Sequence, residues 1–136
     1  MVKLLIGTKG TGKTKVLIAN VNESVTSAEG NVVFISNNTK QNMYDISSKV
    51  RMADTSDFDI TSWDEFLGFI CGIISGNYDI TNIFVDGTLK IVKTTEGFEE
   101  FLTKLDETGK KFDINFELSV SVDAEAAPEY IKKYTK

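Results

Sequence analysis

Eight residues near the start of the chain have the types and the spacing of a phosphate-binding loop. Residues 7–14 read Gly-Thr-Lys-Gly-Thr-Gly-Lys-Thr, which fits the pattern G-x-x-x-x-G-K-[ST]. In such a loop the glycines let the backbone bend so that its N–H groups point at phosphate oxygens. Lys13 would neutralise the β- and γ-phosphates, and the hydroxyl of Thr14 would bind Mg²⁺. The pattern therefore predicts a site for a nucleoside triphosphate.

The segments on either side of this loop are those that it requires. Residues 2–6 form a short apolar run, which is typical of a buried parallel strand. From Lys15 to Ser27 apolar residues recur at helical spacing, and Gly30 is the expected stop. A helix in this place turns its positive end toward a bound anion. The order of strand, loop and helix favours a phosphate site over a glycine-rich turn that binds nothing.

A second residue with chemical potential, Asp86, follows the apolar run at residues 80–85. An acid at the end of a buried strand can hold a metal ion through a water molecule. Asp86 and Gly87 also form a frequent turn dipeptide, so the carboxylate could instead cap the next turn. The phosphate loop on another strand favours the metal role, which makes Thr14 and Asp86 the two predicted metal ligands.

Strands and helices alternate along the rest of the chain. The other expected elements are a strand at residues 31–36, a short edge strand at 50–53, a helix from Ser62 to Gly76, a polar turn after Asp86, a helix from about Thr95 to Gly109, an alternating strand at 112–122 and a short helix after Pro128. This order predicts the α/β class: a single domain, residues 1–136, with a mostly parallel sheet of four or five strands between two layers of helices. Ligands of such sheets bind beyond the carboxyl ends of the strands.

The composition excludes some kinds of catalytic and metal site and indicates the cellular environment. The 136 residues contain no histidine, which excludes histidine acid–base catalysis and the commonest zinc ligand. The single cysteine, Cys71, lies in an apolar helical run and is expected to be buried. A net charge of −5 disfavours non-specific binding to nucleic acid or to an anionic membrane. No apolar segment approaches membrane-spanning length or resembles a signal peptide, so we expect a cytoplasmic protein without membrane insertion.

Two stretches of the sequence, residues 3–25 and 82–86, resemble the P-loop NTPase superfamily. The first contains the Walker A loop, and the second, Asn-Ile-Phe-Val-Asp, resembles the Walker B element. The strand at 112–122 resembles one of the RecA-like branch, which inserts between the P-loop strand and the Walker B strand. The whole chain is similar to small stand-alone bacterial P-loop proteins. This resemblance implies the P-loop NTPase fold, with ATP and Mg²⁺ as ligands.

The resemblance is incomplete at the residue that activates water. RecA-like ATPases commonly carry a glutamate after the Walker B acid or on a nearby strand, whereas Gly87 and Thr88 follow Asp86 here. Glu96 and Glu117 are weak candidates for this role, because each has a plainer interpretation as a helix-terminal or strand-surface charge. Slow hydrolysis, or none, is the expectation that follows.

Three further polar residues each have two interpretations. Ser119 and Ser121 would sense the γ-phosphate, as a polar residue does in the RecA-like branch, or they would face solvent. Arg51, the only arginine, would act as an arginine finger in a neighbouring subunit or lie on a solvated edge.

The sequence also favours ATP over GTP. Residues 86–89 do not match the acid–x–x–glycine switch of GTPases, and residues 38–41 do not match their asparagine–lysine–x–aspartate guanine clamp.

The predicted nucleotide site therefore has named parts. The residues expected to surround the nucleotide are Gly7, Thr8, Lys9, Gly10, Thr11, Gly12, Lys13, Thr14 and Lys15. Lys13 is the expected catalytic residue. Two alternatives stay open: a phosphotransferase whose acceptor pocket comes from residues 37–60, and a non-catalytic adaptor that responds to nucleotide. Hydrolysis of ATP is expected to be weak or dependent on a partner, and the partner would be another protein or a second copy of the chain. The sequence carries no strong signal for nucleic-acid binding.

Overall fold

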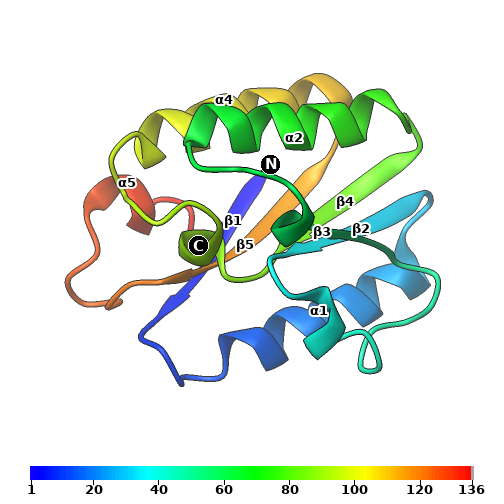
Figure 1. The fold of residues 1–136 in the computed structure, drawn as a ribbon, viewed down its shortest axis with the longest axis horizontal. Helices are drawn as coiled ribbons and strands as arrows, with labels where there is room; N and C mark the ends of the chain where they lie inside the picture. The colour runs from blue at the N-terminus through cyan, green and yellow to red at the C-terminus, as the bar shows by residue number, and fades with distance from the viewer. Residues whose placement is uncertain (136) are drawn as a thin grey trace.

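The computed structural model describes residues 1–135 as an alternation of strands and helices (Figure 1). In chain order the elements are β1 (Val2–Gly7), α1 (Lys13–Ser27), β2 (Asn31–Ser36), the 3₁₀ helix η1 (Thr39–Gln41), β3 (Arg51–Asp54), the 3₁₀ helix η2 (Thr55–Asp57), α2 (Trp63–Ser75), β4 (Ile80–Val85), α3 (Thr88–Ile91), α4 (Phe98–Phe112), β5 (Asn115–Ser121) and α5 (Glu129–Lys132). The P-loop joins β1 to α1, as the sequence pattern requires. No helix within residues 1–135 has the length and apolar character to cross a bilayer.

All five strands run parallel in one sheet, in the order β1-β5-β4-β2-β3. The last strand in the sequence, β5, lies between β1 and β4, where Ser119 pairs with Leu5 and Leu118 pairs with Val85. This arrangement confirms the α/β fold and the predicted insertion between the P-loop strand and the strand of Asp86. The carboxyl ends of β1, β5 and β4 therefore adjoin at one edge of the sheet.

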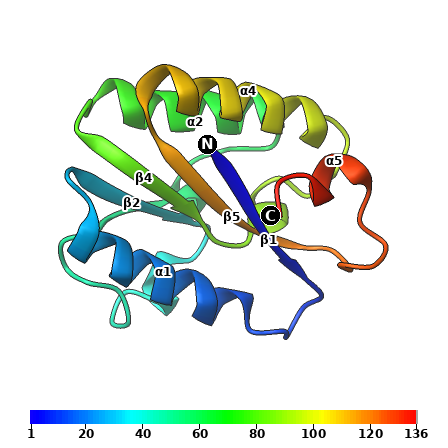
Figure 2. The same cartoon turned by 180° about the vertical axis from the view of Figure 1, so that it is seen from behind.

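Helices cover both faces of the sheet (Figures 1 and 2). On one face α2 and α4 pack side by side, and the ring of Trp63 lies 4.6 Å from that of Phe98 and 4.8 Å from that of Phe101. On the other face α1 buries Leu17 and Val21 against the sheet. The two faces of the sheet thus have separate apolar cores. Together they hold the sheet in place, and with it the carboxyl ends of β1, β5 and β4.

The last strand and the helix before it differ from the sequence prediction of a helix ending at Gly109 and a strand over 112–122. Helix α4 continues to Phe112, and Asp113 ends it with a left-handed φ of 57°. Gly109 serves a close approach instead of a helix end, because a Cβ there would lie 2.7 Å from the carbonyl oxygen of Ile114. The alternating pattern therefore begins inside the helix, and only residues 115–121 form the strand.

Smaller boundaries also differ from the predictions. Helix α1 ends at Ser27, and Gly30 instead admits the backbone of Asp79, whose carbonyl oxygen would lie 2.1 Å from a Cβ at that position. Helix α4 starts at Phe98, after Gly97, and not near Thr95. The expected polar turn after Asp86 is the short helix α3. The expected edge strand at 50–53 is confirmed as β3.

The prediction that Cys71 is buried is wrong, because its side chain is exposed. Helix α2 buries Trp63, Phe66, Ile70 and Ile74 along one face. Cys71 lies on the opposite face, which is made of small residues: Gly68, Cys71, Gly72 and Ser75 are all exposed. Beyond the charged residues of the first turn, Asp64 and Glu65, this exposed face carries no charge. The sequence around Cys71 therefore reads as apolar, and this hid the orientation of its side chain.

Candidate nucleotide-binding site

The P-loop owes its bend to Gly10 and Gly12, which have left-handed φ angles of 88° and 85°. Residues with a Cβ rarely adopt this conformation. Gly12 is also the N-cap of α1, and the first i to i−4 hydrogen bond runs from the N–H of Val16 to its carbonyl. Because the preceding N–H groups have no partner within the helix, those of residues 12–15 are available to an anion.

Within the loop, the carbonyl oxygen of Thr8 accepts three hydrogen bonds. The donors are the backbone N–H of Thr11 at 3.3 Å, the Thr11 hydroxyl at 2.8 Å and the Lys13 ammonium at 3.0 Å. Gly7 has to be small in this arrangement, since a Cβ there would lie 2.6 Å from the Thr11 hydroxyl. These contacts keep the loop curved and hold the ammonium of Lys13 against it.

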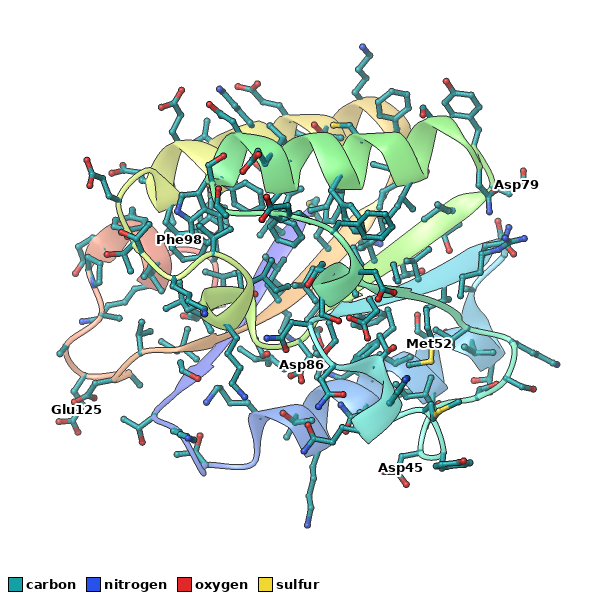
Figure 3. The ribbon with its side chains drawn as sticks, in the orientation of Figure 1. Asp45, Met52, Asp79, Asp86, Phe98 and Glu125 are labelled. Atoms are coloured by element: carbon teal, nitrogen blue, oxygen red, sulfur yellow. The ribbon has the colours of Figure 1, made fainter. Side chains whose placement is uncertain are left out.

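Asp86 follows the carboxyl end of β4, in the region between the sheet and α1 (Figure 3). Its Oδ1 accepts a hydrogen bond from the Thr14 hydroxyl at 3.1 Å and another from the Ser119 hydroxyl at 2.9 Å. The backbone N–H of Gly87 donates in turn to Ser119 Oγ at 2.8 Å. The two predicted metal ligands are therefore in direct contact, although 72 positions separate them in the sequence.

The polar face of β5 is not uniform in its exposure. Ser119 is 2% exposed, so its side chain faces the acid and not solvent. Ser121, two residues further along the strand, is exposed and lines the same cleft as Asp86. Central position in a parallel sheet explains the burial of Ser119, because such strands are covered on both faces.

A cleft of about 570 Å³ opens between the P-loop, the end of β4 and α3. It is lined by Lys9, Gly10, Gly12, Lys13, Thr14, Lys15, Asp86, Gly87, Leu89, Lys90, Ser119 and Ser121. Four of these residues are lysines and one is acidic, so the cleft is positive in a chain whose net charge is −5. Of the predicted loop residues, Gly7, Thr8 and Thr11 shape the loop and lie outside this lining.

The ammonium of Lys13 is influenced by its burial and by two charges. Its pKa is lowered from the ordinary value, chiefly because burial disfavours the charged form. The carboxylate of Asp86 raises this pKa, and the ammonium of Lys90 lowers it. Lys13 therefore lies within electrostatic reach of the acid and of a second cation.

Neither glutamate that the sequence suggested as a catalytic base lines the cleft. Glu117 Oε2 accepts a hydrogen bond from the Asn20 amide at 2.7 Å, and its Oε1 lies 3.9 Å from the Lys3 ammonium. Glu96 lines a separate hollow between the starts of α2 and α4. Within residues 1–135, Asp86 is the one acidic side chain of the cleft.

The remaining candidates lie away from the P-loop. Arg51 is exposed at the amino end of β3, and therefore at the end of the sheet opposite to the cleft. In the segment 37–60, Asp54 accepts hydrogen bonds from the backbone N–H and hydroxyl of Thr39 and from those of Ser56. These bonds lower the pKa of Asp54 to about 2. The carboxylate of Asp54 therefore has a structural role, because it links η1 and η2 to the end of β3.

Thr14 and Asp86 supply oxygen ligands of the hard type that Mg²⁺ prefers. Among residues 1–135, no three histidine, cysteine or acidic side chains gather into a group that could hold a metal ion. A Mg²⁺ ion at this place would complete its shell with water and phosphate oxygens, which is its usual manner of binding. The residues present therefore fit a Mg²⁺ ion that arrives with a nucleotide.

Besides Gly87 of the turn after the acid, two residues of the cleft, Leu89 and Lys90, were missed from the sequence. Both lie on α3, which has only four residues and is too short for a helical periodicity to reveal it. The available signal was the spacing from Gly87 to Lys90, which corresponds to one helical turn directly after the acid.

No family model matches the sequence, and no curated protein matches it either. Solved structures do match, and 102 chains resemble the fold. One of them is a KaiC-like protein from the hyperthermophilic archaeon Pyrococcus horikoshii, with a TM-score of 0.66 and 15% sequence identity. The match covers 98% of this chain and 68% of the archaeal chain. The five-stranded parallel sheet and this likeness together show that the chain has a RecA-like fold.

Proposed function

We propose that this protein binds ATP together with Mg²⁺ in the cleft between the P-loop and Asp86, and that it hydrolyses ATP weakly or only with a partner. One observation carries the proposal. The hydroxyl of Thr14, in the first turn of α1, lies 3.1 Å from the carboxylate of Asp86, which follows β4. Nothing in the local sequence of either residue brings the two side chains together, whereas a Mg²⁺ ion held by a P-loop hydroxyl and a strand-end acid would need both of them at one place.

The charges of the cleft support a polyphosphate as the ligand. The N–H groups at the start of α1 and four lysines face one space, and a nucleoside triphosphate carries the opposite charge. In the proposal Lys13 neutralises the phosphates, while Thr14 and Asp86 orient the metal. Bound Mg²⁺ supplies charge neutralisation across the β- and γ-phosphate oxygens.

Weak hydrolysis follows from the absence of a base in the cleft. Asp86 is held by two hydroxyls through Oδ1, and the glutamates at 96 and 117 have other surroundings. Among residues 1–135, a water molecule near the γ-phosphate would then lack a carboxylate placed to take its proton. Single-turnover assays with labelled ATP measure this directly: we expect slow phosphate release in water, and phosphate transfer that appears only with an added acceptor would contradict hydrolysis.

The metal geometry is tested with Thr14→Val, which removes the hydroxyl, and Asp86→Asn, which removes the carboxylate charge; both keep the side-chain size. In wild-type protein, Mg²⁺ should tighten ATP binding as measured by calorimetry. Both variants should bind metal-free ATP as the wild type does and lose most of the gain from Mg²⁺. Thr26→Val, on an exposed part of α1, is the matched control. If both site variants keep the full Mg²⁺ effect, the proposed metal site is wrong.

A further inference from the structure

Lys90 shares the cleft with the P-loop although it lies far from the loop in the sequence. It belongs to α3, directly after Asp86, and its exposed side chain lines the cleft with Lys13. Among residues 1–135, none of the ion pairs includes Lys90. An exposed lysine is ordinarily a solvated surface charge. Its surroundings therefore decide whether Lys90 has a role in ligand binding.

The backbone below Lys90 is held by several contacts. Gly87 begins the turn with a left-handed φ of 63°, and its N–H donates to Ser119 Oγ at 2.8 Å. Its carbonyl accepts from the N–H of Lys90 at 2.8 Å. On either side of Lys90, the side chains of Thr88 and Ile91 are buried. Lys90 therefore extends from an anchored turn, with a position tied to that of Asp86.

The side chain of Lys90 runs back over Gly87. A Cβ at position 87 would lie 3.2 Å from Lys90 Cδ, closer than ordinary van der Waals contact. The glycine thus provides both the left-handed turn and the space for the stem of Lys90. This packing lays the stem of Lys90 along the turn that borders the cleft.

Two like charges share this cleft. Lys13 lines it from the first turn of α1 and Lys90 lines it from α3, so two ammonium groups border one space. Asp86 is the one acidic side chain of the lining and faces four lysines. An arrangement of this kind is stabilised by a polyvalent anion between the cations.

We propose that Lys90 is a second phosphate-binding lysine, which contacts the terminal phosphate of the bound triphosphate from the β4 side of the cleft. This inference rests on the proposed function. The P-loop, which follows β1, would hold the phosphates from that side, and Thr14 and Asp86 would hold the Mg²⁺ ion that neutralises them. Lys90 follows Asp86 at the end of β4, which β5 separates from the strand of the P-loop. The phosphate nearest to Lys90 would therefore be the one farthest from the P-loop strand, the terminal phosphate. Arg51, at the opposite end of the sheet, cannot take this role within one chain.

The test compares Lys90→Met with Lys93→Met, an exposed lysine outside the cleft lining. Calorimetry with Mg²⁺ measures the affinity of each variant for ATP and for ADP. Lys90→Met should weaken ATP binding roughly tenfold and ADP binding by less than about twofold, since a charge-assisted hydrogen bond to the terminal phosphate is lost. Lys90→Arg should retain most of the ATP affinity, and the control should behave as the wild type does.

Other results separate this inference from the proposed function. If the wild type binds ATP and Lys90→Met weakens ATP and ADP equally, or neither, the role of Lys90 is overturned while the nucleotide site stands. Equal weakening by Lys93→Met would assign the effect to general surface charge and also overturn it. If the folded wild type binds no nucleotide, both proposals fail together.

Discussion

The hydroxyl of Ser119 donates a hydrogen bond of 2.9 Å to Oδ1 of Asp86, joining two neighbouring strands at the edge of the cleft. The same hydroxyl oxygen accepts the N–H of Gly87. One buried side chain therefore orients the acid and fixes the turn that leads to α3. Ser119 acts through Asp86, so its role is to position the acid.

Ser119→Ala is expected to lower both stability and the Mg²⁺ response. The variant leaves the N–H of Gly87 without its partner, which should reduce the free energy of unfolding by about 1–2 kcal/mol in urea titrations. Asp86 would keep only one of its two hydroxyl donors and would be oriented less firmly. The variant should therefore show a smaller gain in ATP affinity on addition of Mg²⁺. Ser75→Ala, on the exposed face of α2, is the control. An unchanged Mg²⁺ effect in the folded variant would mean that Ser119 does not position the acid.

Lys13→Ala is expected to remove nucleotide binding while the domain stays folded. The Lys13 ammonium bonds only to the Thr8 carbonyl among the described residues, so the free energy of unfolding should change by less than about 0.5 kcal/mol. Loss of a charge-assisted contact to phosphate should weaken ATP binding by at least about tenfold. Thermal melts and calorimetry of this variant and of exposed Lys40→Ala measure both effects. Unchanged ATP affinity would remove Lys13 from the site.

Asp54 should make stability depend on pH in acid. Its hydrogen bonds hold the folded pKa at about 2, below the ordinary value of 3.8, so the folded state favours the carboxylate. The stabilisation is then complete above about pH 4 and is lost as the pH falls from about 4 to about 2. Solvent screening limits it to roughly 1 kcal/mol. Urea titrations between pH 4 and pH 2 should show that the free energy of unfolding falls more steeply for wild type than for Asp54→Asn. Exposed Asp59→Asn is the control and should behave as the wild type does. An equal pH dependence in wild type and Asp54→Asn would contradict this role of Asp54.

Cys71 should react with thiol reagents in the native protein. Its side chain is exposed on α2 and forms no disulfide, so Ellman's reagent should modify it without denaturant. Cys71→Ser should leave the free energy of unfolding within about 0.5 kcal/mol of wild type, as for most exposed positions. A thiol that reacts only after unfolding would show that this face of α2 is covered.

The parts that could be predicted from sequence are those written in local patterns. The P-loop follows from its spacing together with the apolar run before it and the helical face after it. The capping pattern at Ser62 is confirmed, because its hydroxyl accepts the N–H of Glu65. The place of β5 in the sheet followed from a family resemblance, since local periodicity does not specify strand order.

The parts that could not be predicted depend on contacts between distant segments. Gly30 and Gly109 look like helix ends, yet each is small because a remote backbone passes close to it. The burial of Ser119 depends on which strands flank β5, and the cleft position of Lys90 depends on a four-residue helix. Periodicity carries no information on either.

The most direct test of the central claim is a calorimetric titration of the folded wild-type protein with ATP, with and without Mg²⁺. The account predicts one binding site per chain, tighter with Mg²⁺ than without it. It also predicts weaker binding of ADP, because the terminal phosphate contacts would be missing. A folded protein that takes up no ATP at millimolar concentration would contradict the account.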